Sequence, residues 1–194
     1  MSSHHFVREG QEPALLIAGA ASLQQAEPLL EWVPLVIVTE EALDHVRAWG
    51  IKIDAVVCLA AHATDIELQL LEQMPFVILP HHPGEDPIAR ALQHVATTRH
   101  AMVNILATPT EALFRRASDF PQLQITLLGS DARWSLSTHF EKWLPAGSRL
   151  YFRPADGQPL TINDRETIEN SYQAPHDGIV RIHAGHPFWV GELM

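Results

Sequence analysis

Two spacings of hydrophobic residues divide the chain near residue 121. In the first part, short apolar runs alternate with segments whose apolar residues recur every three or four positions. An unbroken β-branched run is typical of a strand that is buried on both faces of a parallel sheet. The expected strands are Ala14–Ala18, Leu35–Val38, Asp54–Leu59, Phe76–Leu79 and Met102–Leu106.

Helices are expected between these strands, at Ser22–Trp32, Glu40–Trp49, Ile66–Met74, Asp86–Thr97 and Ala112–Ser118. Pro28 interrupts the first helix, Gly50 ends the second, and Thr39 is placed to cap it. Strands that alternate with helices predict a parallel sheet with right-handed crossovers, in which ligands gather at the carboxyl ends of the strands.

After residue 121 the pattern changes to short β-type runs separated by turn residues such as Pro145–Gly147. These runs are Leu123–Leu128, Arg133–Ser137, Arg149–Arg153, Pro159–Asn163, Ile179–His183 and Pro187–Val190. We therefore expect two domains. Residues 1–121 form an α/β domain with a mainly parallel sheet and flanking helices, and residues 122–194 form a small all-β, sandwich-like domain.

Composition narrows the classes of partner and compartment. The net charge is −10, with 13 Lys and Arg against 23 Asp and Glu, and no basic cluster occurs, so a nucleic-acid partner is not expected. The single cysteine, Cys58, excludes an internal disulfide and fits a reducing compartment. The apolar stretch Ala14–Leu23 is shorter than the roughly 20 residues that span a bilayer. We expect a cytoplasmic protein without a membrane partner.

Three short sequences follow one another without a gap in register between residues 37 and 62: Ile37–Leu43, Gly50–Asp54 and Ala55–His62. Their order and spacing resemble the thiamine pyrophosphokinase family, which carries Asp-Gly-Gly-Ala, Gly-Ile-x-Pro-Asp and Gly-Asp-x-Asp-Ser in these places. The resemblance extends weakly to Gly84–Leu92, Ile125–Trp134, Tyr151–Pro154 and Val180–His183. It implies a catalytic α/β domain, a thiamine-binding β domain and a homodimer.

The residues that run the family's chemistry are mostly replaced. Leu59 and Ala61 stand where the resemblance implies paired aspartates that hold Mg²⁺ against the phosphates of ATP, and neither side chain can bind a cation. The family's Gly-Gly-Arg-x-Asp-His loop is missing between Ala107 and Glu111, and Ser171–Gln173 replaces its Ser-Asn-Glu element. No catalytic residue is therefore predicted. The polar residues predicted to mark a vestigial nucleotide-site edge are Glu40, Asp54, His62, Glu85 and Asp86.

Three hypotheses of function remain open. The first is a thiamine pyrophosphokinase-like protein that is inactive or altered, and that persists as a binding or structural dimer with a nucleotide or thiamine-like ligand. The second is an active kinase that transfers pyrophosphate from ATP to thiamine, with Mg²⁺ held by substitute carboxylates such as Glu40, Glu85 and Asp86. The third is a metal-binding protein or hydrolase, with Zn²⁺ held by His62, His81 and His82.

Overall fold

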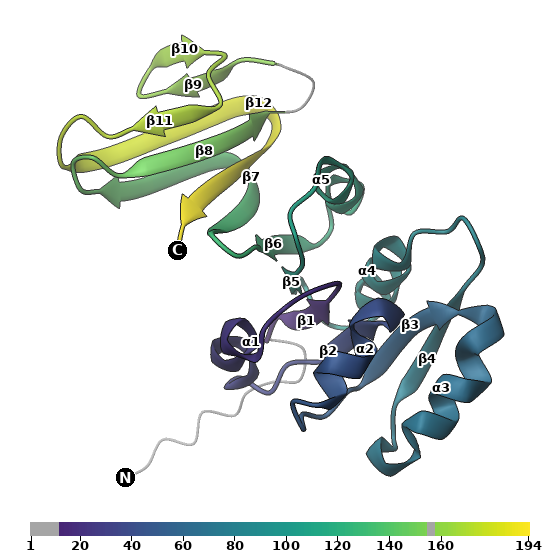
Figure 1. The fold of residues 1–194 in the computed structure, drawn as a ribbon. Coiled ribbons are helices and arrows are strands. Elements are labelled where there is room, and N and C mark those ends of the chain that lie inside the picture. Colours follow the sequence, from purple (N-terminus) through teal and green to yellow (C-terminus); the bar gives the residue numbers. More distant parts are fainter. Residues whose placement is uncertain (1–11, 155–157) are drawn as a thin grey trace, which may run out of the picture. The chain divides into compact units, whose positions relative to one another are not determined.

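The structure is a computed structural model that describes residues 12–154 and 158–194 (Figure 1). The chain divides into two compact units, Met1–Ile125 and Thr126–Met194. The first unit is an α/β unit and the second is rich in strands. We refer to them as the α/β unit and the β unit and describe each by itself.

The α/β unit is built on five strands whose paired neighbours all run parallel, in the order β5–β1–β2–β3–β4. The central strands β1 and β2 are buried along their whole length, because both faces of the sheet are covered. The strands are β1 (Ala14–Ile17), β2 (Val36–Thr39), β3 (Ala55–Leu59), β4 (Val77–His81) and β5 (Met102–Leu106).

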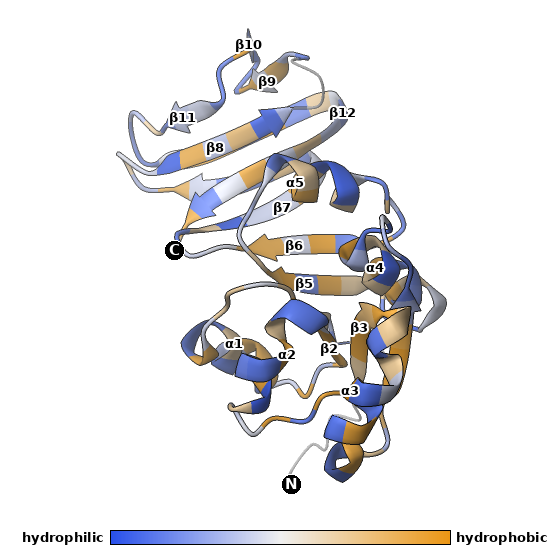
Figure 2. Cartoon of the chain, turned by 45° about the vertical axis from the view of Figure 1, so that its right-hand side comes forward, coloured by the Kyte–Doolittle hydropathy of each residue, from blue (hydrophilic) through white to orange (hydrophobic). Residues whose placement is uncertain are grey.

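The helices of this unit are amphipathic, and Figure 2 shows them with hydrophilic and hydrophobic sides. They are α1 (Leu23–Leu30), α2 (Glu40–Arg47), α3 (Ala63–Gln69), α4 (Pro87–Thr97) and α5 (Glu111–Ser118), with short 3₁₀ turns at η1 (Ala60–His62) and η2 (Leu71–Gln73). Among the described residues, no helix is long and apolar enough to cross a membrane.

Some side chains at the helix starts form capping hydrogen bonds, and others do not. Ser22 and Gln25 form a reciprocal capping box at α1, and the Thr110 hydroxyl accepts a hydrogen bond from the Leu113 amide at 3.2 Å. Thr39 has the backbone geometry of an N-cap, but its side chain makes no capping bond, so that prediction is wrong. Pro28 lies inside α1 and does not end it.

The β unit is organised by one long strand, β12 (Gly178–Leu193), which runs antiparallel to β7 (Ala132–Leu144) along most of its length. The register breaks between His183 and Phe188. On its other side, β12 pairs first with β9 (Leu160–Ile162) and, after the break, with β8 (Arg149–Pro154). The remaining strands are β6 (Gln124–Leu128), which spans the boundary between the units, β10 (Arg165–Thr167) and β11 (Ser171–Gln173).

The core of the β unit comes from alternate residues of these strands, as the banded hydropathy of β8 in Figure 2 illustrates. It contains the buried residues Leu144, Leu150, Phe152, Leu160, Ile162, Ala174, Val180, Ile182, Phe188 and Val190. The runs expected at Ile179–His183 and Pro187–Val190 are one bent strand, because the turn residues between them form a register break and not a reversal.

Candidate functional site

The carboxyl edge of the parallel sheet collects most of the polar residues predicted to mark a site. Thr39 ends β2 and Glu40 begins α2, His62 closes the turn that follows β3, and His81 ends β4. Glu85 and Asp86 lie in the connection from β4 to α4. The edge falls into two groups of contacts, one after β2 and β3 and the other after β4.

In the first group, Glu40 bridges two adjacent strand ends. Its Oε1 atom lies 2.5 Å from Nδ1 of His62, and its Oε2 atom accepts a hydrogen bond from the Leu59 amide at 3.0 Å. Each carboxylate oxygen therefore already has a partner within the chain. The hydroxyl oxygen of the neighbouring Thr39 is buried and has no hydrogen-bond partner among the described residues.

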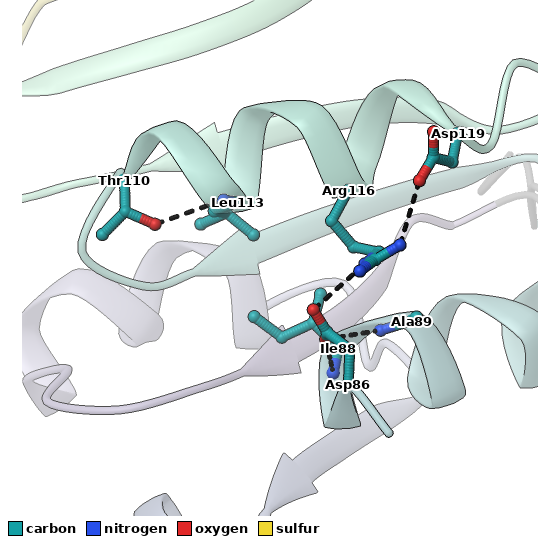
Figure 3. Close-up of polar contacts among 7 residues, drawn as sticks. All are labelled: Asp86, Ile88, Ala89, Thr110, Leu113, Arg116 and Asp119. Carbon is teal, nitrogen blue, oxygen red and sulfur yellow. Dashed lines mark hydrogen bonds and ion pairs between the residues drawn. The ribbon is translucent and has the colours of Figure 1, made fainter. Parts of the chain in front are cut away.

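In the second group, Asp86 ties two helices together (Figure 3). Its Oδ1 atom accepts hydrogen bonds from the amides of Ile88 at 2.8 Å and Ala89 at 3.1 Å, which caps α4. Its Oδ2 atom accepts a hydrogen bond from Nε of Arg116 on α5 at 3.0 Å, and Arg116 also contacts Asp119 at 3.1 Å. The hydrogen bond and charge of Asp86 raise the pKa of the Arg116 guanidinium.

The loop between β4 and α4 borders a hollow of about 560 Å³ whose lining includes Arg90 and Arg116. Glu85 accepts a hydrogen bond from the His82 amide at 2.7 Å, and Nδ1 of His81 lies 3.2 Å from the His82 carbonyl oxygen. The hollow therefore has acidic and basic groups side by side. Asp86 pairs with Arg116, whereas Glu85 and Arg90 bond to the backbone of His82 and Pro80.

Cys58 lies on β3 close to this edge and is fully buried. Burial, and secondarily the charge of Glu40, raises the pKa of its thiol to about 11. The thiol is therefore protonated at neutral pH, which fits a packed small hydrophobic side chain and not a nucleophile.

Asp54 is not brought together with the other predicted edge residues. It precedes β3, and its Oδ2 atom accepts a hydrogen bond from the Val36 amide at 2.9 Å, at the start of β2. The beginnings of parallel strands lie at the opposite edge from their carboxyl ends. Asp54 therefore lies at the other edge of the sheet and not at the edge where the sequence placed it. Its bond to Val36 gives it a structural task in joining two strands.

The three histidines predicted to bind a metal do not assemble in this structure. His62 contacts Glu40 after β3, whereas His81 and His82 engage the loop after β4. Within residues 12–154 and 158–194, no group of three or more His, Cys, Asp or Glu side chains is arranged to hold a metal ion. A parallel sheet fixes which strand ends are neighbours but not how their side chains turn, so a shared edge alone does not bring the three imidazoles together.

Sequence reasoning missed the pairing of Asp86 with Arg116, whose two residues lie 30 positions apart. The short segment Arg115–Asp119 signals only a charged helix end, and nothing local identifies its distant partner. The Glu40–His62 contact spans 22 positions, and the sequence predicted both residues at this edge but not their contact.

The fold is that of a known class of protein. No family model matches the sequence, and no curated protein does so either. Solved structures of thiamin pyrophosphokinases do match. The enzyme from Candida albicans aligns with a TM-score of 0.68 at 8% identity, over 94% of this chain and 90% of that one. The enzyme from Geobacillus thermodenitrificans aligns with a TM-score of 0.67 at 8% identity, over 93% of this chain and 97% of that one.

A third structure, thiamine pyrophosphokinase from Bacillus subtilis, aligns with a TM-score of 0.62 at 10% identity, over 92% of this chain and 98% of the other. The likeness thus includes both the α/β unit and the β unit. The resemblance seen in the sequence is confirmed as a thiamine pyrophosphokinase-like fold in a strongly diverged chain.

Proposed function

We propose that the chain is a thiamine pyrophosphokinase-like protein that has lost or altered phosphotransfer and acts as a binding or structural protein. One observation carries the proposal: the likeness in fold spans more than nine-tenths of the chain, yet its strand ends lack the expected metal ligands. Leu59 and Ala61 occupy the end of β3 and the turn after it. A hard cation such as Mg²⁺ needs oxygen ligands, which these side chains lack.

The nearby carboxylates offer little support for a substitute site. Glu40 is engaged by His62 and the Leu59 amide, and Asp86 by the α4 amides and Arg116. A metal ion would have to displace these partners and draw the two groups together. Phosphoryl transfer relies on positioned metal ions and cationic groups, so their loss lowers the rate by orders of magnitude.

The proposal also includes the type of sheet, the second domain, the oligomeric state and the class of ligand. We expect a mainly parallel sheet followed by a β-sandwich-like thiamine-binding domain, as the fold likeness suggests, and a homodimer in the reducing environment of the cytoplasm. A nucleotide or thiamine-like small molecule is the expected class of ligand. The strand ends that carry Glu40 and His62 are its expected place, because ligands of α/β sheets collect there.

Isothermal titration of the purified protein with a non-hydrolysable ATP analogue, with and without Mg²⁺, and then with thiamine, tests the proposal. We expect no binding of the nucleotide that depends on Mg²⁺. A Mg²⁺-dependent heat in the unaltered protein would instead favour a working kinase and contradict the proposal.

A paired variant sharpens this experiment. Leu59→Asp with Ala61→Asp places two carboxylates where the family resemblance expects them, and should create Mg²⁺-dependent nucleotide binding if the metal ligands are what the site lacks. Leu68→Asp with Leu71→Asp is the matched control, because these side chains are 61% and 52% exposed and lie elsewhere in the α/β unit.

A further inference from the structure

Three basic side chains gather at one open end of the β unit. A hollow of about 580 Å³ is lined there by residues of β7, β8 and β12 and of the turn between β7 and β8. We call this place the β mouth and define it by its polar residues Arg133, Lys142, Ser148, Arg149 and Glu192. All of them lie within the β unit, so the mouth is described by this unit alone.

Strand register places charged residues of the mouth on the core-facing side of their strands. Glu192 of β12 is opposite Arg133 of β7 on one side and opposite Leu150 of β8, a core residue, on the other. Residues directly opposite each other in a sheet project from the same face. Arg133 and Glu192 therefore share the face of buried Leu150, where the pattern of the sheet calls for apolar residues.

Lys142 also lies on the core-facing side of its strand, because it is opposite the buried core residue Val180. Its Nζ atom forms an ion pair with the carboxylate of Glu192, from the far end of β12. By contrast, Arg181 and Glu141 pair with each other at 2.7 Å on the other face of these strands, as ordinary exposed residues do. Arg133, Lys142 and Glu192 thus project from the core-facing side of their strands at an open end of the unit, where the Lys142 side chain is still 49% exposed.

The charges in the mouth do not balance. Arg133, Lys142 and Arg149 line the hollow together with a single carboxylate, Glu192, which is already paired with Lys142. Arg149 directly precedes Leu150 in β8, so it projects from the alternate face and borders the hollow at its rim. Within the described part of the chain, neither arginine has an ion-pair or hydrogen-bond partner for its guanidinium. The mouth holds three of the six Lys and Arg residues of 126–194, in a chain whose net charge is −10. Such a cluster repels itself unless an anion lies between its members.

The floor of the hollow is apolar and its rim carries a hydroxyl group. Leu144 and Leu150 are 6% and 1% exposed and form part of the core beneath it. At the rim, Gly147 has a φ of +82°, and Ser148 follows it in the turn from β7 to β8. A hollow of this size, with a few convergent polar groups above apolar side chains, has the usual form of a small-molecule site.

We propose that the β mouth binds a small organic dianion, a phosphate monoester with a compact apolar group. The forked guanidinium groups of Arg133 and Arg149 suit the oxygens of a phosphate, which accept paired N–H donors. The Ser148 hydroxyl can donate a third hydrogen bond, and the apolar group rests on Leu144 and Leu150. This site lies in the β unit and does not depend on the function proposed above for the strand ends of the α/β unit.

Titration with phenyl phosphate, followed by calorimetry and by NMR of the arginine side chains, tests the proposal. We expect binding of phenyl phosphate that is stronger than that of inorganic phosphate, with phenol showing none at the same concentrations. Arg133→Gln with Arg149→Gln should weaken the binding by about tenfold or more, because two charge-assisted contacts are lost.

Arg115→Gln with Arg165→Gln is the matched control, since it removes the same charge from exposed positions outside the mouth. It should leave the affinity for phenyl phosphate within about twofold, after correction for ionic strength. Thermal unfolding of both double variants verifies that each is folded. The proposal is overturned if phenyl phosphate does not bind, if phenol binds as well, or if both double variants weaken binding equally.

Discussion

The carboxyl edge of the α/β sheet and the β mouth treat charge in opposite ways. At the sheet edge, Glu40 and Asp86 have partners for both carboxylate oxygens within the chain. At the mouth, two arginines line a hollow and have no ion-pair partner among the described residues. The carboxylates at the edge where this fold class suggests chemistry are thus satisfied within the chain, whereas the arginines of the mouth, which nothing in the sequence marked, are open to a ligand.

The difference has a simple physical origin. A polar group that is paired within the folded chain must give up that partner before it can bind a ligand, so pairing favours structure over binding. A charge that is held near others of its sign lowers stability, and proteins keep such arrangements mainly at functional sites.

The largest expected effect concerns the reactivity of Cys58, next to the sheet edge. Because the pKa of its thiol is raised from 9.0 to about 11, the thiolate fraction at pH 8 is about a hundredfold below that of an ordinary thiol. We expect alkylation by iodoacetamide to be at least that much slower in the folded protein than in urea, by mass spectrometry. The rate should rise as the pH passes from 8 towards 11. Equal alkylation rates in the folded protein and in urea would mean that the Cys58 thiol is accessible in the folded state.

A second prediction examines the packed region beside the mouth. A Cβ atom at Gly191 would lie 2.7 Å from the ring of Trp134, which also has Arg153 over it at 5.6 Å. Gly191→Ala should therefore lower the free energy of unfolding by about 1–3 kcal/mol, measured by urea denaturation. Gly185→Ala is the control, because a Cβ atom there meets nothing within 4 Å. Equal stability of the two variants would argue against this packing.

A third prediction concerns the capping of α4. Asp86→Ala removes the acceptor of two backbone amides and should lower the free energy of unfolding by about 0.5–2 kcal/mol. Asp86→Ser restores a capping oxygen but not the contact with Arg116, and should recover most of that loss. Asp119→Ala should change stability by less than about 0.5 kcal/mol, because its side chain is 62% exposed. If Asp86→Ala and Asp119→Ala behave alike, Asp86 does not act as a cap.

The smallest expected change comes from the mouth. Arg133→Gln with Arg149→Gln should leave the free energy of unfolding within about 0.5 kcal/mol of the original or raise it slightly, because unpaired like charges are removed. Glu192→Gln should act in the other direction, since it leaves three basic groups without their carboxylate. A clear loss of stability in the double arginine variant would show that these arginines stabilise the fold and are not held ready for a ligand.

Much of the fold could be predicted from the sequence. Periodicity located all five parallel strands, since continuous runs such as Val36–Val38 are buried on both faces and have few alternatives. The β unit was predicted less well. Three-residue strands such as β10 and β11 carry too few positions for a pattern, and the length of β7 was hidden by the exposed residues Glu141 and Lys142.

The candidate sites could be predicted only in part, for a different reason. Topology sends Glu40 and His62 to one edge, and that much follows from strand order. Asp54 was misplaced because a residue just before a strand lies at the other edge. The β mouth was missed altogether, since Arg133 and Glu192 meet only through the register of strands some 60 residues apart in the chain, about which local patterns carry no information.

The most direct test of the account is an assay of turnover. Purified protein is incubated with ATP, thiamine and Mg²⁺, and the release of AMP and formation of thiamine diphosphate are followed by chromatography, with a thiamin pyrophosphokinase as the positive control. We expect no thiamine-dependent AMP from this chain under conditions in which the control enzyme turns over. Thiamine-dependent release of AMP, matched by thiamine diphosphate, would contradict the loss of phosphotransfer and identify a working kinase with substitute ligands.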